Sequence, residues 1–247
     1  MRELDSWLEI AKSAALEGGN YLLQNQGKEL KVLMDSGRDI KLQLDTDTEK
    51  LIKENLNLQS SFSILGEETG LSNNLGEFYW VVDPLDGTSN FLRDIPISCV
   101  SIALMQDVTP ILGVIYDFNH DDLYFGHQNS KAFLNQNEIT VSDYSKKNQS
   151  TLVTGIPAKT HYSDEEFKNM INDFQDWKKV RMIGSAAMAA IYVAAGKAET
   201  YKENGIFLWD IAAGAAIVEA AGGVASIKNI QADYRVDAIF TNQHLAN

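Results

Sequence analysis

The chain has 247 residues, of which 45% are apolar, so it can bury a sizeable core in one large layered unit or in two packed subdomains. Its net charge of −13 argues against nucleic acid polymers and anionic membranes as partners. A single cysteine excludes an internal disulfide, and the lack of a signal-peptide pattern or of a membrane-spanning apolar segment predicts a cytoplasmic protein.

Two amphipathic helices are predicted at the start of the chain. Apolar residues recur at helical spacing over residues 3–23, and those over residues 51–56 mark a second helix after Asp45. Asp47 and Glu49 are interpreted as the acidic first turn of this second helix, where the helix dipole favours negative charge. The apolar faces of both helices are expected to pack against a core rather than to bind a ligand.

The segment that reads WVVDPLDGTSNF carries the strongest chemical signal. A short apolar strand runs into Asp83 and Asp86, and Pro84 stiffens the turn between them because its ring fixes φ. Hard cations such as Mg2+ bind a few carboxylates together with phosphate oxygens. Gly87 lets a ligand approach the backbone, and Thr88 opens a helical turn whose free N–H groups attract anions. The segment therefore predicts a cation held against a phosphate, although Asp-Gly-Thr is also a common turn.

The two halves of the chain have different patterns. Apolar runs between residues 100 and 125 predict adjacent strands of an antiparallel sheet. After the polar stretch 142–150, strands and helices alternate, which is typical of a layered α/β unit. We therefore expect an N-terminal α+β subdomain over residues 1–145, with most metal ligands, and a C-terminal α/β subdomain over residues 146–247, with substrate-side residues. The site is expected between them, where ligand clefts tend to form.

Two further segments present acidic side chains at the ends of apolar runs. Glu67 and Glu68 follow one such run, and Asp210 opens the apolar stretch 211–221. Asp210 also suits the N-cap of a helix, and Glu68 is interpreted as a solvated or supporting neighbour of Glu67. Several carboxylates brought together would repel one another unless cations lay among them, so the pattern predicts a metal site.

The motifs GEE, DPLDGTSNF and GIFLWDIAAGAAIVEAAGG, in this order and at these separations, resemble the inositol monophosphatase family of metal-dependent phosphatases over nearly the whole chain. The resemblance implies a layered αβαβα sandwich of the sugar phosphatase type, in the α+β or α/β class, with two or three Mg2+ ions per site. It also implies lithium inhibition, a homodimer, and hydrolysis of a small phosphorylated metabolite without a covalent intermediate. The sequence LDGT also resembles part of the haloacid dehalogenase signature, but Pro84 stands where that signature needs a nucleophilic aspartate.

The family motifs assign roles to positions of this chain. The implied metal ligands are Glu67, Asp83, the Leu85 carbonyl, Asp86 and Asp210. The implied substrate-binding residues are Gly87, Thr88, Ser185, Ala186, Glu203 and Asp210. The implied catalytic residues are Glu67, Thr88 and its hydrogen-bonding partner Asp45, which would orient the attacking water. The Gly87 and Thr88 amides would hold phosphate oxygens, and Glu203 would contact substrate hydroxyls.

The chain departs from the family pattern in three places. Leucine stands where the family has threonine within the run 39–45. A lysine of the family would fall at Met34, and Arg38 or Lys31 could substitute for it. The terminal helix common in the family has no counterpart after the strand-like residues 238–241. The geometry of a third metal and the packing near the end of the chain are therefore expected to differ.

The sequence thus predicts a Mg2+-dependent phosphomonoesterase that hydrolyses inositol monophosphate or a similar small polyol or sugar phosphate by metal-activated water. Family phosphatases that act on 3'-phosphoadenosine 5'-phosphate, histidinol phosphate or fructose 1,6-bisphosphate remain alternatives, because few residues contact the substrate beyond its phosphate. From a different class, a catalytically degenerate metal-binding interaction protein also remains open.

Overall fold

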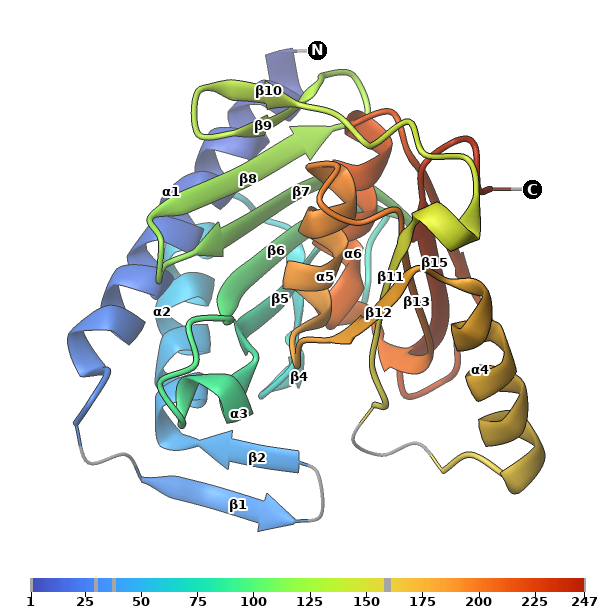
Figure 1. The fold of residues 1–247 in the computed structure, drawn as a ribbon. Coiled ribbons are helices and arrows are strands. Elements are labelled where there is room, and N and C mark those ends of the chain that lie inside the picture. The colour runs from blue at the N-terminus through green and yellow to red at the C-terminus, as the bar shows by residue number, and fades with distance from the viewer. Residues whose placement is uncertain (1, 29–30, 37–38, 158–160, 247) are drawn as a thin grey trace.

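The computed structural model describes residues 2–28, 31–36, 39–157 and 161–246, and its helices and sheets alternate in layers (Figure 1). Helices α1 (Arg2–Asn25) and α2 (Gln43–Gln59) cover one face of a large sheet. Helices α5 (Ala186–Ala194) and α6 (Leu208–Ala220) lie between this sheet and a smaller one. Helix α4 (Asp164–Asp176) lies on the far side of the smaller sheet (Figure 1). The predicted αβαβα sandwich is confirmed.

The large sheet has eight strands within the described residues, in the order β10-β9-β8-β7-β6-β5-β3-β4. Its strands are β3 (Ser63–Gly66), β4 (Gly70–Leu71), β5 (Phe78–Asp86), β6 (Cys99–Gln106), β7 (Thr109–Asp117), β8 (Asp122–His127), β9 (Ala132–Leu134) and β10 (Asn137–Ile139). Strands β3 and β5 run parallel, whereas the other neighbours run antiparallel, so the sheet as a whole is mixed. The predicted adjacent antiparallel strands between residues 100 and 125 are confirmed as β6, β7 and β8. The parallel pair places Gly66 beside Val82 and so brings the residue after β3 next to Asp83.

The smaller sheet has the order β12-β11-β13-β15-β14. Its strands are β11 (Thr151–Thr154), β12 (Lys179–Met182), β13 (Thr200–Phe207), β14 (Val224–Lys228) and β15 (Arg235–Thr241). Strand β11 runs parallel to both of its neighbours, while β15 runs antiparallel to β13 and β14. Because β11 and β13 are parallel, their carboxyl ends meet at one edge, where ligands bind in α/β sheets.

Helix α2 begins earlier than the sequence pattern predicts. It starts at Gln43, so Asp45 rather than Asp47 or Glu49 is the acidic residue of its first turn. Glu49 lies beyond the first turn and is fully buried, so its interpretation as an acidic residue of that turn is wrong. A small hairpin of β1 (Val32–Ser36) and β2 (Asp39–Leu42) leads into this helix.

The helices of the middle layer join the two halves of the chain. One apolar cluster includes Leu65 of the large sheet, Ile211 of α6 and Tyr201 of the smaller sheet. Gly113 in β7 leaves no room for a side chain, because the Ala213 carbonyl of α6 lies against it. The division into subdomains at residues 145 and 146 stays a prediction.

Two short helical elements complete the fold. Helix α3 (Thr88–Phe91) follows β5 directly, and a single turn, η1 (Lys147–Gln149), precedes β11. After β15 the structure describes no helix up to residue 246, which agrees with the expected lack of a terminal helix in that stretch.

Candidate active site

Strand β5 ends in a bulge that places two carboxylates on the same face of the sheet. Asp83 pairs with Ser101 and Asp86 pairs with Cys99, so β5 has one extra residue between these pairs. In a regular strand, residues three apart point to opposite faces, whereas the bulge returns both aspartates to one face. Both side chains are buried, and the Leu85 amide donates to Asp83 Oδ1 over 3.0 Å.

Glu67 follows the parallel strand β3 and lies against Asp83. Its amide donates to the Val82 carbonyl over 3.1 Å, which fixes the start of the turn on β5. The pKa of Glu67 is raised to about 7, mainly by burial and then by the nearby charge of Glu68, while a hydrogen bond with Asp83 opposes the rise. The carboxyl groups of Glu67 and Asp83 are therefore in direct contact.

Asp210 comes from the C-terminal half of the chain. Helix α6 begins at Leu208, so Asp210 is the third helical residue rather than the N-cap. Its Oδ2 atom accepts a hydrogen bond from the Phe207 amide over 3.3 Å. The Ser101 hydroxyl of β6 donates to the Trp209 carbonyl over 3.4 Å, which ties this helical turn to the large sheet.

The four carboxyl groups of Glu67, Asp83, Asp86 and Asp210, here called the acid cluster, influence one another electrostatically. Burial raises the pKa of Asp83 well above its usual range, and the charges of the other three raise it further. Burial and the charges of Glu67 and Asp86 also raise the pKa of Asp210. Burial raises the pKa of Asp86 to about 6, although a hydrogen bond from Ser185 opposes the rise. Such a cluster is unfavourable unless positive charge offsets it.

The acid cluster fits a hard divalent cation by its chemistry. Carboxylate oxygens and a backbone carbonyl, here that of Leu85, are ligands that Mg2+ prefers. Among the described residues, no three His, Cys, Asp or Glu side chains are already arranged as a complete metal site. The carboxyl groups instead bond to one another and to the chain, as Glu67 does to Asp83 and Asp86 does to Ser185.

Gly87 and Thr88 form the turn after β5. Gly87 has φ +88°, and a Cβ there would lie 2.7 Å from the Ile97 carbonyl, so the turn requires glycine. The Thr88 hydroxyl donates to the Leu85 carbonyl over 3.0 Å. The predicted hydrogen bond between Thr88 and Asp45 is therefore wrong for this structure, because the threonine hydroxyl is already directed at its own turn.

Asp45 lies in the first turn of α2 and close to the Glu67 turn. Leu42 occupies the N-cap position and has no side chain to cap the helix, but its amide donates to Asp45 Oδ2 over 2.8 Å. Burial raises the pKa of Asp45 to about 8, with smaller contributions from Glu68 and Glu67. The other oxygen, Oδ1, is buried and has no hydrogen-bond partner within the described residues. It is thus available to accept a hydrogen bond.

Ser185 and Ala186 lie at the start of helix α5 and beside the acid cluster. The Ser185 hydroxyl donates to Asp86 Oδ2 over 2.5 Å, and the Ala187 amide donates to the same oxygen over 2.7 Å. Ser185 is also the N-cap of α5, since its Oγ accepts from the Met188 amide over 3.2 Å. The start of α5 is therefore held against a predicted metal ligand.

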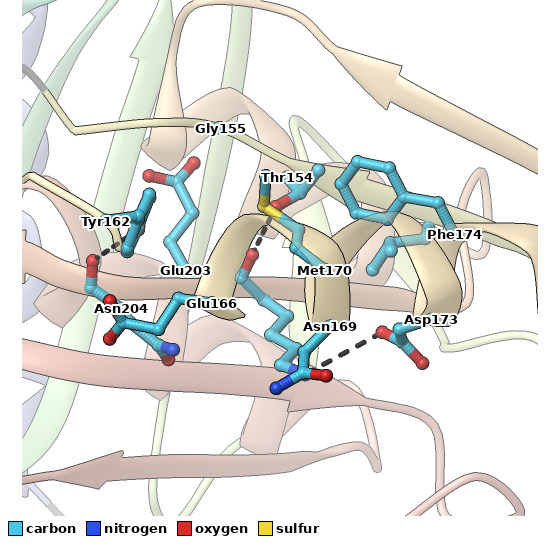
Figure 2. A pocket seen from close by; sticks show the side chains of 12 residues that line it. Thr154, Gly155, Tyr162, Glu166, Asn169, Met170, Asp173, Phe174, Glu203 and Asn204 are labelled. Carbon is cyan, nitrogen blue, oxygen red and sulfur yellow. Dashed lines mark hydrogen bonds and ion pairs between the residues drawn. The ribbon is translucent and has the colours of Figure 1, made fainter. Parts of the chain in front are cut away.

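Glu203 forms part of the wall of a cavity of about 210 Å³ between α4 and strands β11 and β13 (Figure 2). The pKa of Glu203 is raised to about 8, mainly by burial and then by the charge of Asp86, while a hydrogen bond with Tyr201 opposes the rise. Glu203 in turn raises the pKa of Asp210. The side chain therefore lies within electrostatic range of the acid cluster and also borders the cavity.

Glu49 supports the site, although its place in the sequence pattern did not reveal it. Its buried carboxylate accepts hydrogen bonds from the Glu68 amide (2.8 Å), the Thr69 amide (3.1 Å) and the Thr69 hydroxyl (2.5 Å). It also lies 3.0 Å from the Lys53 ammonium. A Cβ at Gly66 would come within 2.5 Å of this carboxylate. Glu49 therefore holds the turn that carries Glu67, and no sequence signal distinguishes it from a glutamate on the surface of a helix.

Lys41 supplies positive charge at the same turn. Its ammonium lies 3.1 Å from Glu68 Oε1, and it lowers the pKa of Glu67. The Glu68 side chain is only 6% exposed, so Glu68 is a supporting neighbour rather than a solvated residue. The alternatives predicted from the sequence were Lys31 and Arg38, and Arg38 lies outside the described residues.

Comparison with known proteins gives one consistent match. The model of the "Inositol monophosphatase family" matches residues 3–239. The "Nus factor SuhB" of Xylella fastidiosa is 38% identical over 220 residues, covering 87% of this chain and 80% of that protein. The "Fructose-1,6-bisphosphatase/inositol-1-monophosphatase" of Aquifex aeolicus is 34% identical over 231 residues, covering 92% and 88% of the two chains. A solved structure of inositol monophosphatase from Anabaena has a TM-score of 0.83 at 33% identity, covering 97% and 92%.

The helices do not meet the requirements for crossing a membrane within the part of the chain that the structure describes. A spanning helix needs about 20 mostly apolar residues. Within the described residues, no helix is both long enough and apolar enough to meet this requirement.

Proposed function

Because the chain belongs to the inositol monophosphatase family, we propose that it is a Mg2+-dependent phosphomonoesterase that hydrolyses inositol monophosphate or a similar small polyol or sugar phosphate. The observation that carries this proposal is the acid cluster. Its four carboxyl groups come from three separate segments and influence one another electrostatically; Asp83 and Asp86 are buried, and Glu67 and Asp210 are half-buried. Burying these groups together is costly without cations, so their convergence supports a metal-dependent reaction.

In the proposed mechanism, Mg2+ would be held by the acid cluster and the carbonyl of Leu85. When bound, it would offset the negative charge of the phosphate and activate water for attack. The Gly87 and Thr88 amides would bind phosphate oxygens at the turn after β5. Glu67 and the unpaired Oδ1 of Asp45 would accept hydrogen bonds from the attacking water and so orient it toward phosphorus.

The substrate alcohol would lie on the side of the C-terminal half. Ser185 and Ala186 begin α5 beside Asp86 and would line this side of the site. Burial raises the pKa of Glu203 to about 8, and its carboxyl group, at the end of the cavity, would hydrogen-bond to a substrate hydroxyl. This arrangement supports an uncharged, hydroxyl-bearing leaving group.

Phosphate release measured with and without Mg2+ tests this proposal. The panel contains inositol monophosphate, fructose 1,6-bisphosphate, histidinol phosphate and 3'-phosphoadenosine 5'-phosphate, since the substrate stays open within the family. We expect Mg2+-dependent release that is highest for the inositol or sugar phosphate. If calorimetry shows that the protein binds Mg2+ but no substrate of the panel releases phosphate, a metal-binding interaction protein would be favoured. One relative that is named as a Nus factor, SuhB, is consistent with this alternative.

Lithium inhibition and a homodimer are part of the same proposal, because both follow from the family. Lithium chloride is expected to inhibit phosphate release at concentrations at which sodium chloride does not. Light scattering coupled to size-exclusion chromatography is expected to give twice the chain mass of 27.4 kDa. A monomer in that measurement would remove the homodimer from the proposal.

A further inference from the structure

The cavity between α4 and the smaller sheet has a polar end and an apolar middle. Figure 2 shows Tyr162 and Glu203 at one end, Met170 in the middle, and Phe174 with Asp173 at the other end. The Tyr162 hydroxyl donates to a backbone carbonyl of β13 over 2.9 Å, which holds its ring in the wall. The Glu203 end of the cavity is the one nearer the acid cluster in electrostatic terms, because the charge of Asp86 raises the pKa of Glu203.

The cavity lies where α4 packs loosely on the sheet and where a glycine follows strand β11. None of the residues of α4 is buried, although Met170 and Phe174 face the sheet. Gly155 follows β11, and a Cβ at this position would overlap the Glu203 carboxyl group. The missing side chain therefore gives Glu203 room to extend along the end of the cavity.

The charged groups of the cavity are engaged within the chain. Asp173 lies 2.7 Å from the Lys147 ammonium and 3.7 Å from that of Lys202. Glu166 accepts hydrogen bonds from the amide and hydroxyl of Ser163, over 2.7 Å and 2.8 Å. A ligand in the middle of the cavity would therefore meet mainly the apolar parts of the wall, which are contributed by Leu152, Tyr162, Met170 and Phe174.

We propose that this cavity is a subsite for the part of the substrate alcohol that lies beyond the hydroxyls at Glu203, and that it accepts a compact, uncharged apolar or aromatic ring. The inference rests on the proposed phosphatase function and narrows its substrate class. The cavity volume of about 210 Å³ is below the roughly 300–1,000 Å³ of sites for drug-sized ligands, so it suits a single ring.

A matched pair of substrates separates the subsite from the reaction itself. Ethyl phosphate and 2-phenylethyl phosphate are both primary alkyl esters, but only the second carries a ring, which the proposal places in the cavity. Burial of a phenyl group is expected to raise kcat/KM of the wild-type protein with 2-phenylethyl phosphate about tenfold or more over ethyl phosphate. Equal kcat/KM values for the two esters would overturn the proposal.

The variant Met170→Trp fills the middle of the cavity without touching the acid cluster. It should remove the preference for 2-phenylethyl phosphate while leaving the rate with ethyl phosphate unchanged. The control Lys168→Trp places the same side chain on an exposed position of α4 that does not line the cavity, and the preference should remain. A preference that survives Met170→Trp would contradict the subsite and would indicate a solvent-filled gap under α4.

Binding of the free alcohol keeps this test independent of catalysis. Ligand-observed NMR with 2-phenylethanol should show binding to the wild-type protein and to Lys168→Trp, but not to Met170→Trp. Wild-type protein that binds 2-phenylethanol but hydrolyses neither ester would refute the proposed phosphatase and retain the cavity as a ring-binding site. Hydrolysis of ethyl phosphate with no binding of 2-phenylethanol would refute the subsite alone.

Discussion

Replacing Glu49 by glutamine is expected to loosen the turn that carries Glu67. The Glu49 carboxylate accepts three hydrogen bonds from Glu68 and Thr69 and lies 3.0 Å from the Lys53 ammonium. In Glu49→Gln, an amide NH2 group replaces one acceptor oxygen and faces a hydrogen-bond donor. The ion pair with Lys53 is lost as well, although the shape of the side chain is kept.

The expected cost follows from these contacts. A hydrogen bond to a charged group contributes about 1.5–3 kcal/mol, and removing one partner of a buried ion pair costs about 3–5 kcal/mol. Because glutamine keeps part of the hydrogen bonding, we expect a loss of about 2–3 kcal/mol in the free energy of unfolding. In a chain of this size, such a loss corresponds to a fall in Tm of about 4–12 °C.

Urea unfolding and hydrogen exchange measure the two parts of this prediction. The free energy of unfolding should fall, and the amides of Glu68 and Thr69 should lose protection because they lose their acceptor. The control Glu54→Gln changes an exposed carboxylate of the same helix, 4.0 Å from Lys50, and should alter stability by less than about 0.5 kcal/mol. Equal stabilities of the two variants, with unchanged protection of both amides, would refute the reasoning.

Three further predictions concern the acid cluster and its turn. Asp83→Asn should lower turnover by orders of magnitude without changing the circular dichroism spectrum, because it removes a predicted metal ligand; near-normal turnover would exclude that role. In the folded protein, burial raises the pKa of Glu67 to about 7 and that of Asp86 to about 6. With a chelator present, the free energy of unfolding should therefore be greatest at a pH below the pKa values of these groups in the unfolded chain, and it should fall as the pH rises through 6 and 7. A Tm that increases as the pH rises through 6 and 7 would contradict this prediction. Gly87→Ala should cost about 1–3 kcal/mol, because φ is +88° and the Ile97 carbonyl lies 2.7 Å from the added Cβ, and an unchanged Tm would argue against this strain.

The main acids of the candidate site could be predicted because their motifs are local. Asp83 and Asp86 lie three residues apart after an apolar strand, and Glu67 and Asp210 stand at the ends of apolar runs. The ends of strands and helices can be recognised from periodicity, and the resemblance to a family predicts that these ends lie close together in the fold. The layered fold could be predicted for the same reason.

Other features depend on contacts that no sequence pattern reveals. The bulge that turns Asp83 and Asp86 to one face follows from pairing with β6, and the parallel pairing of β3 and β5 sets the position of Glu67. Glu49 resembles any helix-surface glutamate until the turn after β3 closes over it. Lys41 lies in a hairpin strand too short to give a periodic signal.

Anomalous diffraction from crystals soaked in Mn2+, a substitute for Mg2+, tests the central claim most directly. The claim is that the acid cluster holds the cations on which phosphate hydrolysis depends. We predict anomalous peaks within coordination distance of Glu67, Asp83, Asp86 and Asp210, and loss of these peaks in Asp83→Asn. Protein that hydrolyses phosphate esters with Mn2+, but whose crystals show no peak among these four residues, would contradict the claim.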